Sequence, residues 1–66
     1  MRITVNGEGK EFSAPLAVSA LLAELGLEPR KIAVERNLAI VPKSLFEETL
    51  LFDGDQIEIV QFVGGG

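Results

Sequence analysis

The sequence of residues 51–66 is LFDGDQIEIVQFVGGG, and this stretch decides the fold expected for the chain. Its Asp53-Gly54 dipeptide predicts a tight turn, because glycine adopts backbone conformations that other residues avoid. An apolar run over residues 56–63 then predicts a strand. Three glycines follow that run directly. We therefore expect a narrow C-terminal segment that extends directly from the last strand of a packed domain, and not a frayed end.

The strand expected over residues 56–63 has an inner and an outer face. Successive strand residues point to opposite sides of a sheet, so Val60 and Phe62 face outward if Ile57 and Ile59 face the core. We expect Val60, Phe62 and Val63 to form an apolar patch that binds a partner protein. The alternative is that Val60 and Phe62 lie beneath a loop of the same domain.

Two hairpins are predicted upstream of this strand. Residues 2–5 alternate polar and apolar side chains, and the Asn6-Gly7 dipeptide after them is typical of a two-residue hairpin turn. Residues 10–12 are the expected return strand, with the turn widened by a glycine. The second hairpin is expected from residues 32–35 and 39–41, and a proline at position 42 ends it.

One helix is predicted between the hairpins, because apolar residues recur at i, i+3, i+4 and i+7. This stripe consists of Val18, Leu21, Leu22 and Leu25. Gly26 is expected to end the helix in the left-handed conformation. The start is less defined, since Pro15 suits a first helical turn whereas Ala17 is a poor cap. A further short helical turn is expected over residues 44–48.

The predicted order of elements is strand, strand, helix, strand, strand, strand. A helix and a sheet can each bury one apolar face against the other, which gives a two-layer α+β domain. The last strand can then lie parallel to the first in the sheet centre. This is the β-grasp, or ubiquitin-like, arrangement: a mixed sheet of four to five strands packed on one helix. We expect one such domain over residues 1–66, with a flexible C-terminal tail at residues 63–66; other small α+β domains share the order of elements.

Composition excludes several classes of function. The 66-residue chain has no cysteine and no histidine, so a zinc cage, a thiol nucleophile and a self-contained hydrolase or transferase are not expected. Asp53 and Asp55 are interpreted as turn residues, and no metal site is expected. A formal net charge of −4 disfavours nucleic acid and suits a basic protein surface. Without a long apolar run or a signal-peptide pattern, we expect a cytoplasmic protein that does not bind a membrane.

Three stretches of the chain resemble one known family. These are the Asp-Gly-Asp turn and strand at residues 51–59, the glycine-ended segment at residues 62–66, and ERNLAIVP at residues 35–42. Together they resemble the ThiS/MoaD family of small bacterial sulfur carriers, most closely its thiamine-biosynthesis branch. The resemblance covers essentially the whole chain. One departure is Ala17, where a serine or threonine cap is expected in that family.

The resemblance implies a protein cosubstrate and not an enzyme. The carboxylate of Gly66 would be adenylated by an E1-like adenylating enzyme, and a sulfur donor protein would convert it to a thiocarboxylate. Thiazole synthase would then take the sulfur for the thiazole ring of thiamine. Gly64 and Gly65 would give the tail its reach and slimness. ATP is expected to be held by the activating partner, since this chain has no phosphate-binding glycine loop and is expected to bind no cofactor.

Two alternatives remain open from the sequence. The first is another sulfur carrier, such as the small subunit of molybdopterin synthase, because the glycine tail and acidic turn are shared within the family. The second is a β-grasp interaction domain whose terminal glycines carry no chemistry.

Overall fold

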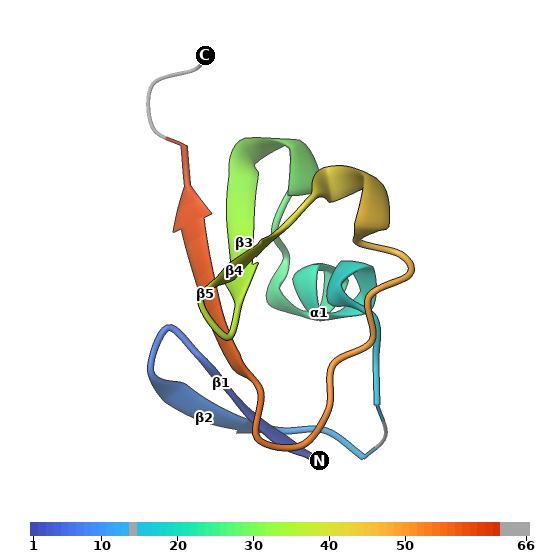
Figure 1. Cartoon of the computed structure of the whole chain (residues 1–66), viewed down its shortest axis with the longest axis vertical. Helices are drawn as coiled ribbons and strands as arrows, with labels where there is room; N and C mark the ends of the chain where they lie inside the picture. The colour runs from blue at the N-terminus through green and yellow to red at the C-terminus, as the bar shows by residue number, and fades with distance from the viewer. Residues whose placement is uncertain (14, 63–66) are drawn as a thin grey trace.

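The computed structural model describes residues 1–13 and 15–62, and these form a five-stranded sheet with an α-helix across one face (Figure 1). The strands are β1 (Arg2–Val5), β2 (Glu8–Glu11), β3 (Ile32–Arg36), β4 (Ala39–Val41) and β5 (Gln56–Gln61). The helical elements are α1 (Val18–Leu25) and the short 3-10 turns η1 (Pro29–Lys31) and η2 (Lys43–Leu45).

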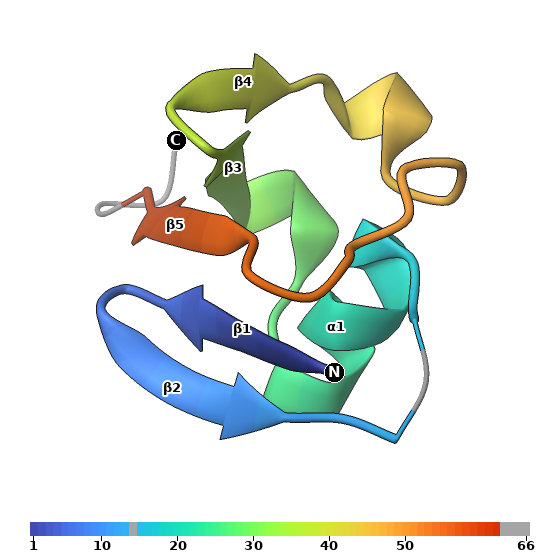
Figure 2. The same ribbon diagram turned by 60° about the horizontal axis from the view of Figure 1, so that its bottom comes forward.

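The last strand occupies the middle of the sheet. The strand order is β2-β1-β5-β3-β4, and Figure 2 shows β5 between β1 and β3. β5 runs parallel to β1 and antiparallel to β3, while both hairpins are antiparallel. This mixed sheet, with one helix on its inner face, confirms the fold class that the sequence predicts.

The first hairpin turns where expected, but its second strand begins earlier. Asn6 and Gly7 have φ values of 50° and 84°, as a two-residue turn of this kind requires. Val5 therefore pairs directly with Glu8, and Gly9 pairs with Thr4 within the ladder instead of widening the turn. The predicted return strand over residues 10–12 was thus placed too late, because a tight turn needs no extra residue.

Helix α1 ends as predicted but begins without a side-chain cap. Gly26 has φ 71° and closes the helix in the left-handed conformation. At the other end, Ala17 makes no capping hydrogen bond, and the N–H groups of the first turn donate instead to backbone carbonyls of a distant segment. These donors are satisfied at 2.9 Å each: Val18 N by Thr49 O, and Ser19 N by Phe46 O. Pro15 lies before the helix, so its expected place in the first turn was wrong.

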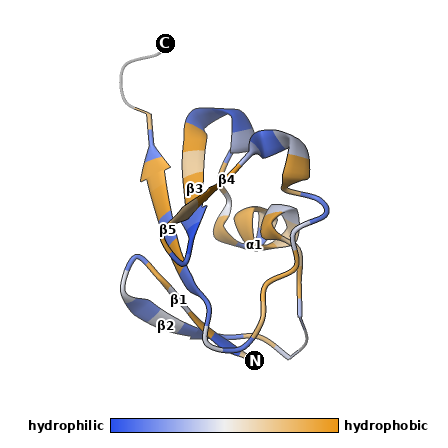
Figure 3. Cartoon of the chain, viewed as in Figure 1, coloured by the Kyte–Doolittle hydropathy of each residue, from blue (hydrophilic) through white to orange (hydrophobic). Residues whose placement is uncertain are grey.

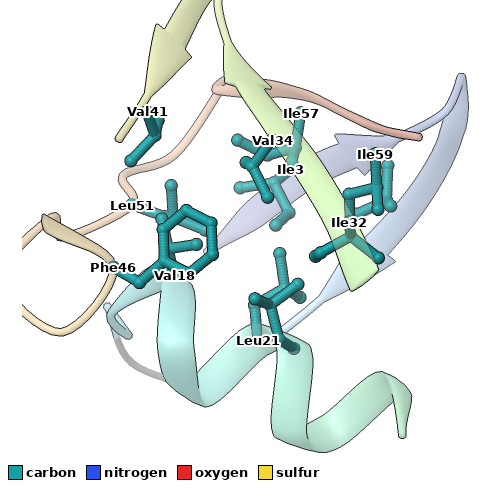
Figure 4. Packing of buried hydrophobic residues seen from close by; sticks show 12 residues of the cluster. Ile3, Val18, Leu21, Ile32, Val34, Val41, Phe46, Leu51, Ile57 and Ile59 are labelled. Atoms are coloured by element: carbon teal, nitrogen blue, oxygen red, sulfur yellow. The ribbon is translucent and has the colours of Figure 1, made fainter. Parts of the chain in front are cut away.

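One apolar cluster joins the helix to the sheet. Figure 3 shows hydrophobic segments concentrated on α1, β3 and β5, and Figure 4 shows their side chains meeting in a single core. Phe46 enters this cluster from the segment after η2, a turn that covers residues 43–45 and not the expected 44–48. The buried hydrophobic residues are Ile3, Val5, Val18, Leu21, Leu22, Ile32, Val34, Val41, Phe46, Leu51, Ile57 and Ile59. In the part of the chain that the structure describes, no helix has the length and apolar character needed to cross a membrane.

Candidate functional site

Strand β5 is held on both sides, and its outer residues are presented to solvent. It pairs with β3 along five residues but with β1 only at Thr4↔Gln56 and Val5↔Ile57. Beyond that point the side chain of Asn6 continues the contact with β5. Its Oδ1 accepts a hydrogen bond from Ile59 N at 2.7 Å, and its Nδ2 donates to Ile59 O at 3.2 Å. Asn6 therefore acts like one more residue of the ladder and fixes the second half of β5.

The two faces of β5 are separated as the sequence predicts. Ile57 and Ile59 are buried, whereas Val60 and Phe62 are 61% and 57% exposed. The alternative that Val60 and Phe62 lie beneath a loop of the same domain is therefore wrong. Whether this outward pair binds a partner stays a prediction.

Phe62 is fixed at the point where β5 ends. Its backbone N–H donates to the carbonyl of Lys31 at 2.8 Å, which extends the pairing with the chain ahead of β3. The Lys43 ammonium lies 5.2 Å from the centre of the Phe62 ring, within the range of a cation–π interaction. Val63, Gly64, Gly65 and Gly66, and with them the predicted tail at 63–66, lie outside the described residues.

A polar network lies at the other end of β5. Asp55 is only 8% exposed, and its carboxylate accepts hydrogen bonds from Phe52 N at 2.9 Å and from Asn37 Nδ2 and Arg36 Nε at 3.0 Å each. Asn37 also accepts from Gln56 N at 2.9 Å. The network thus ties the β3–β4 turn to the start of β5 and sets the position of the central strand.

Two opposing effects act on the ionisation of Asp55. Burial by itself raises the pKa of this carboxyl, because the charged form loses hydration. The Phe52 N–H, the Asn37 amide and the Arg36 guanidinium outweigh that effect and lower the pKa below its usual 3.8. The residue is therefore a fixed, ionised structural anchor, and its environment does not favour a proton-transfer role at neutral pH.

The Asp-Gly-Asp segment serves the turn, as predicted. Asp53 accepts a hydrogen bond from Arg2 N at 2.8 Å. The backbone N–H of Gly54 donates to Arg2 O at 2.8 Å, and Gly54 has φ 89°, in the left-handed region. Within residues 1–13 and 15–62, no three acidic, histidine or cysteine side chains are grouped so as to hold a metal ion.

The strand order and the exposed end of the central strand define the class of protein to which this chain belongs. This chain is a small β-grasp, or ubiquitin-like, protein whose central strand leads directly into its last residues. The model of the ThiS family matches residues 3–66, and the chain belongs to that family.

Proteins of known name and structure are similar over the full length of this chain. The sulfur carrier protein ThiS of Escherichia coli is 32% identical over 66 residues, and the match covers 100% of both chains. The crystal structure of the thiamine biosynthesis protein ThiS from Geobacter metallireducens superposes with a TM-score of 0.86 at 33% identity, and each chain is covered completely. The thiazole synthase of Paramagnetospirillum magneticum is 56% identical over 66 residues, but this chain spans only 20% of its length. A second thiazole synthase, from Magnetococcus marinus, is likewise matched over 20% of its length.

Proposed function

We propose that this chain is a sulfur carrier of thiamine biosynthesis and acts as a protein cosubstrate, not as a catalyst. The observation that supports this proposal most strongly is a sequence match to a protein named as a sulfur carrier, which covers the full length of both chains. The geometry supports the proposal, because β5 is paired on both sides and Phe62, four residues before Gly66, is exposed at its end. We assign the reacting group to Gly66, the last of the three glycines that follow the apolar run over residues 56–63.

The proposed chemistry begins with activation of the Gly66 carboxylate. A carboxylate resists attack, so one of its oxygens first attacks the α-phosphate of ATP and displaces pyrophosphate. An E1-like adenylating enzyme would bind the ATP and form this acyl adenylate in the cytoplasm. A persulfide on a donor protein then attacks the acyl carbon and displaces AMP, which gives an acyl disulfide. A thiol acts as the two-electron reductant: it attacks the donor's sulfur, forms a disulfide with it and releases the thiocarboxylate. Covalent activation of this kind divides one difficult substitution into easier steps.

Thiazole synthase is the proposed acceptor of the sulfur. Support comes from relatives named thiazole synthase that contain a segment matching all 66 residues of this chain. Covalent linkage gives two modules a high effective concentration relative to each other. Such a linkage is an advantage when the two modules must bind each other repeatedly. We infer that the separate chain meets the same partner by diffusion.

The proposal is tested by intact mass after incubation with the cognate adenylating enzyme, ATP and a sulfur donor. A carrier gains about 16 Da, since one carboxylate oxygen is replaced by sulfur through the activated acyl group. Thiazole synthase and its small-molecule substrates should then return the chain to its original mass. A chain whose mass never changes would be an interaction domain, and the proposal would fail.

The position of the reacting carboxyl is tested by deleting Gly66 or adding one alanine after it. Either change moves the carboxylate by about 3.5 Å relative to the partner's catalytic groups. A misplacement of even ~1 Å can lower a rate about 100-fold, so ATP–pyrophosphate exchange should fall steeply in both variants. The melting temperature should stay within about 2 °C, because terminal residues usually contribute little to a packed core. Wild-type exchange in either variant would show that Gly66 is not the reacting group.

A further inference from the structure

Two asparagines occupy equivalent places in the two hairpins. Asn6 and Asn37 each begin a tight turn, and both have φ 50°. The backbone N–H of Asn6 donates to Ile57 O at 2.9 Å. That of Asn37 donates to Gln56 O at 2.8 Å. Both side chains also hydrogen-bond to β5, but Asn37 contacts the start of the strand, whereas Asn6 contacts the half that leads towards Gly66.

The Asn6 side chain takes the place of β1 beside the second half of β5. Strand β1 ends at Val5, which pairs with Ile57. Two residues further along β5, Asn6 Oδ1 accepts a hydrogen bond from Ile59 N at 2.7 Å, and Asn6 Nδ2 donates to Ile59 O at 3.2 Å. At Ile59, the partner on this side of β5 is therefore a side chain and not a strand.

On its other side, the end of β5 is paired with the beginning of β3. Gln61 is opposite Ile32, the first residue of β3. Just beyond this pair, Phe62 N donates to Lys31 O at 2.8 Å. The ends of structural elements open more readily than their middles, and here two ends meet. A restraint on the opposite side of β5 therefore adds most at this end, where pairing with β3 is weakest.

We propose that Asn6 is a positioning residue for the reacting end of the chain, because its amide holds the end of β5 from which the last four residues extend. The inference rests on the proposed function. Four residues span at most about 14 Å, so Gly66 reaches a partner's reactive groups only close to the point where β5 ends. If the end of β5 opened as far as Ile59, seven residues would precede the carboxylate, with a reach of about 25 Å. A longer connection lowers the effective concentration of the reacting end and reduces the fraction of positions that are aligned for reaction.

The test compares Asn6→Gly with Asn37→Gly, the same substitution at the equivalent place in the other hairpin. Glycine adopts the left-handed conformation freely, so both turns are retained. Each variant loses two side-chain hydrogen bonds, which for Asn37 are those with Asp55 and Gln56. Asp55 is still held in Asn37→Gly by the Arg36 guanidinium and a backbone N–H.

ATP–pyrophosphate exchange is measured against carrier concentration, below the melting temperature of both variants. In Asn6→Gly the kcat should fall about fivefold or more, because the reacting end is less often aligned. The KM for the carrier should stay within about twofold, since no other surface of the folded chain is altered. In Asn37→Gly both constants should stay within about twofold of wild type, because the change lies at the opposite end of β5.

A second variant separates hydrogen bonding from side-chain size. Aspartate tolerates the left-handed region, and Asn6→Asp keeps an acceptor for Ile59 N. Its second carboxylate oxygen faces Ile59 O and cannot donate to it. The kcat should therefore fall in Asn6→Asp as well, and a wild-type kcat there would contradict the role assigned to the amide.

Amide hydrogen exchange, followed by NMR, reports whether the end of β5 loosens. The bond from Phe62 N to Lys31 O is not altered by either glycine variant. If Asn6 holds the end of the strand, exchange at Phe62 should become about fivefold or more faster in Asn6→Gly and stay at the wild-type rate in Asn37→Gly. Faster exchange at Ile59 alone would show that Asn6 serves only that residue, and the inference would fail.

The outcomes separate this inference from the proposed function. A wild-type kcat in Asn6→Gly, or an equal loss of kcat in Asn37→Gly, would overturn the inference while the proposed function stands. The same holds for a loss of kcat without faster exchange at Phe62, because the strand end would then not be the cause. A wild-type chain that is never adenylated would overturn the proposed function and this inference with it.

Discussion

Asp55 is the residue on which the position of the central strand depends most directly. Its carboxylate is surrounded by two N–H donors and the Arg36 guanidinium, and the Arg36 group in turn lies 5.8 Å from the centre of the Phe52 ring. Hydrogen bonds to an ionised group are among the stronger polar contacts in proteins. The turn, the second hairpin and β5 are thereby linked through one side chain.

Asp55→Asn should weaken the fold in a pH-dependent way. Because the pKa of Asp55 is lowered in the folded state, its ionised form stabilises the fold at pH values above the unfolded pKa of about 3.8. That contribution is lost as the pH falls through the lowered folded pKa. At pH 7 the variant should lose about 1.5–3 kcal/mol of unfolding free energy, the range for a hydrogen bond to a charged group. Urea denaturation at pH 7 and at steps below pH 4 measures the difference.

The difference in unfolding free energy between wild type and Asp55→Asn should narrow as the pH falls from about 3.8 through the lowered folded pKa. Glu48→Gln, at an exposed position, provides the control and should show no comparable loss. A deficit that is the same at every pH would mean that the shape of the side chain, and not its charge, holds the network.

At the residue scale, local chemistry was predictable and distant pairing was not. The turn at Asp53-Gly54 could be predicted from glycine's freedom at φ 89° and from the local hydrogen bond of Asp55 N to Phe52 O, whereas the bonds of this turn to Arg2 could not. Asn6 was assigned only to its own turn, although its side chain also pairs with Ile59, 53 residues away. An amide that offers a donor and an acceptor can continue a ladder. Nothing in the adjacent sequence identifies the strand that it meets.

At the scale of the element, α1 is an eight-residue helix that depends on its surroundings. Helices of this length are marginal in water, so most of their stability comes from packing of an apolar face. Its Gly26 end was predictable from a left-handed residue next to the apolar stripe. Its start was not, because Thr49 and Phe46 supply the carbonyls that cap it, and sequence distance hides them.

Leu22→Ala is the test of the helix at this scale. Leu22 is completely buried in the middle of the apolar stripe, so truncation should cost about 2–5 kcal/mol. In a domain of this size, such a loss is a large part of the total stability. The urea midpoint should fall strongly, whereas Glu24→Ala on the exposed side of the same helix should change it little. A midpoint as high as that of the wild type would contradict the packing of α1 described here.

At the scale of the whole molecule, the two sides of the sheet have different roles. Helix α1 crosses the inner face of the sheet (Figure 1), and the two enclose the core. The outer face leaves apolar residues such as Val60 exposed to solvent. The overall arrangement was predictable, because strand and helix periods and the position of the last strand allow few connections. The binding partners of the outer face could not be predicted, because exposed residues do not pack inside the domain and so follow no periodic pattern in the sequence.

Phe62→Ala should separate docking from folding. Because Phe62 is 57% exposed, the melting temperature should change by less than about 3 °C. Binding to the adenylating enzyme, measured by calorimetry, should weaken by about 1 kcal/mol or more, as for a large apolar anchor. Phe52→Ala is the matched control, because Phe52 is 50% exposed and also has a cation, Arg36, over its ring. Unchanged affinity with a collapse in thermal stability would instead place Phe62 in the domain's own core.

The central place of β5 also has a consequence for how the chain is made. Synthesis proceeds from the N-terminus, yet the sheet lacks its middle until residues 56–61 have left the ribosome. Until then the two hairpins have no common neighbour, and the parallel contact of β1 with β5 must close a loop of about 50 residues. Contacts so distant in sequence slow folding. The nascent chain would therefore wait unfolded and then close in one cooperative step, so the segment that would carry the chemistry is presented only by a chain that has folded completely.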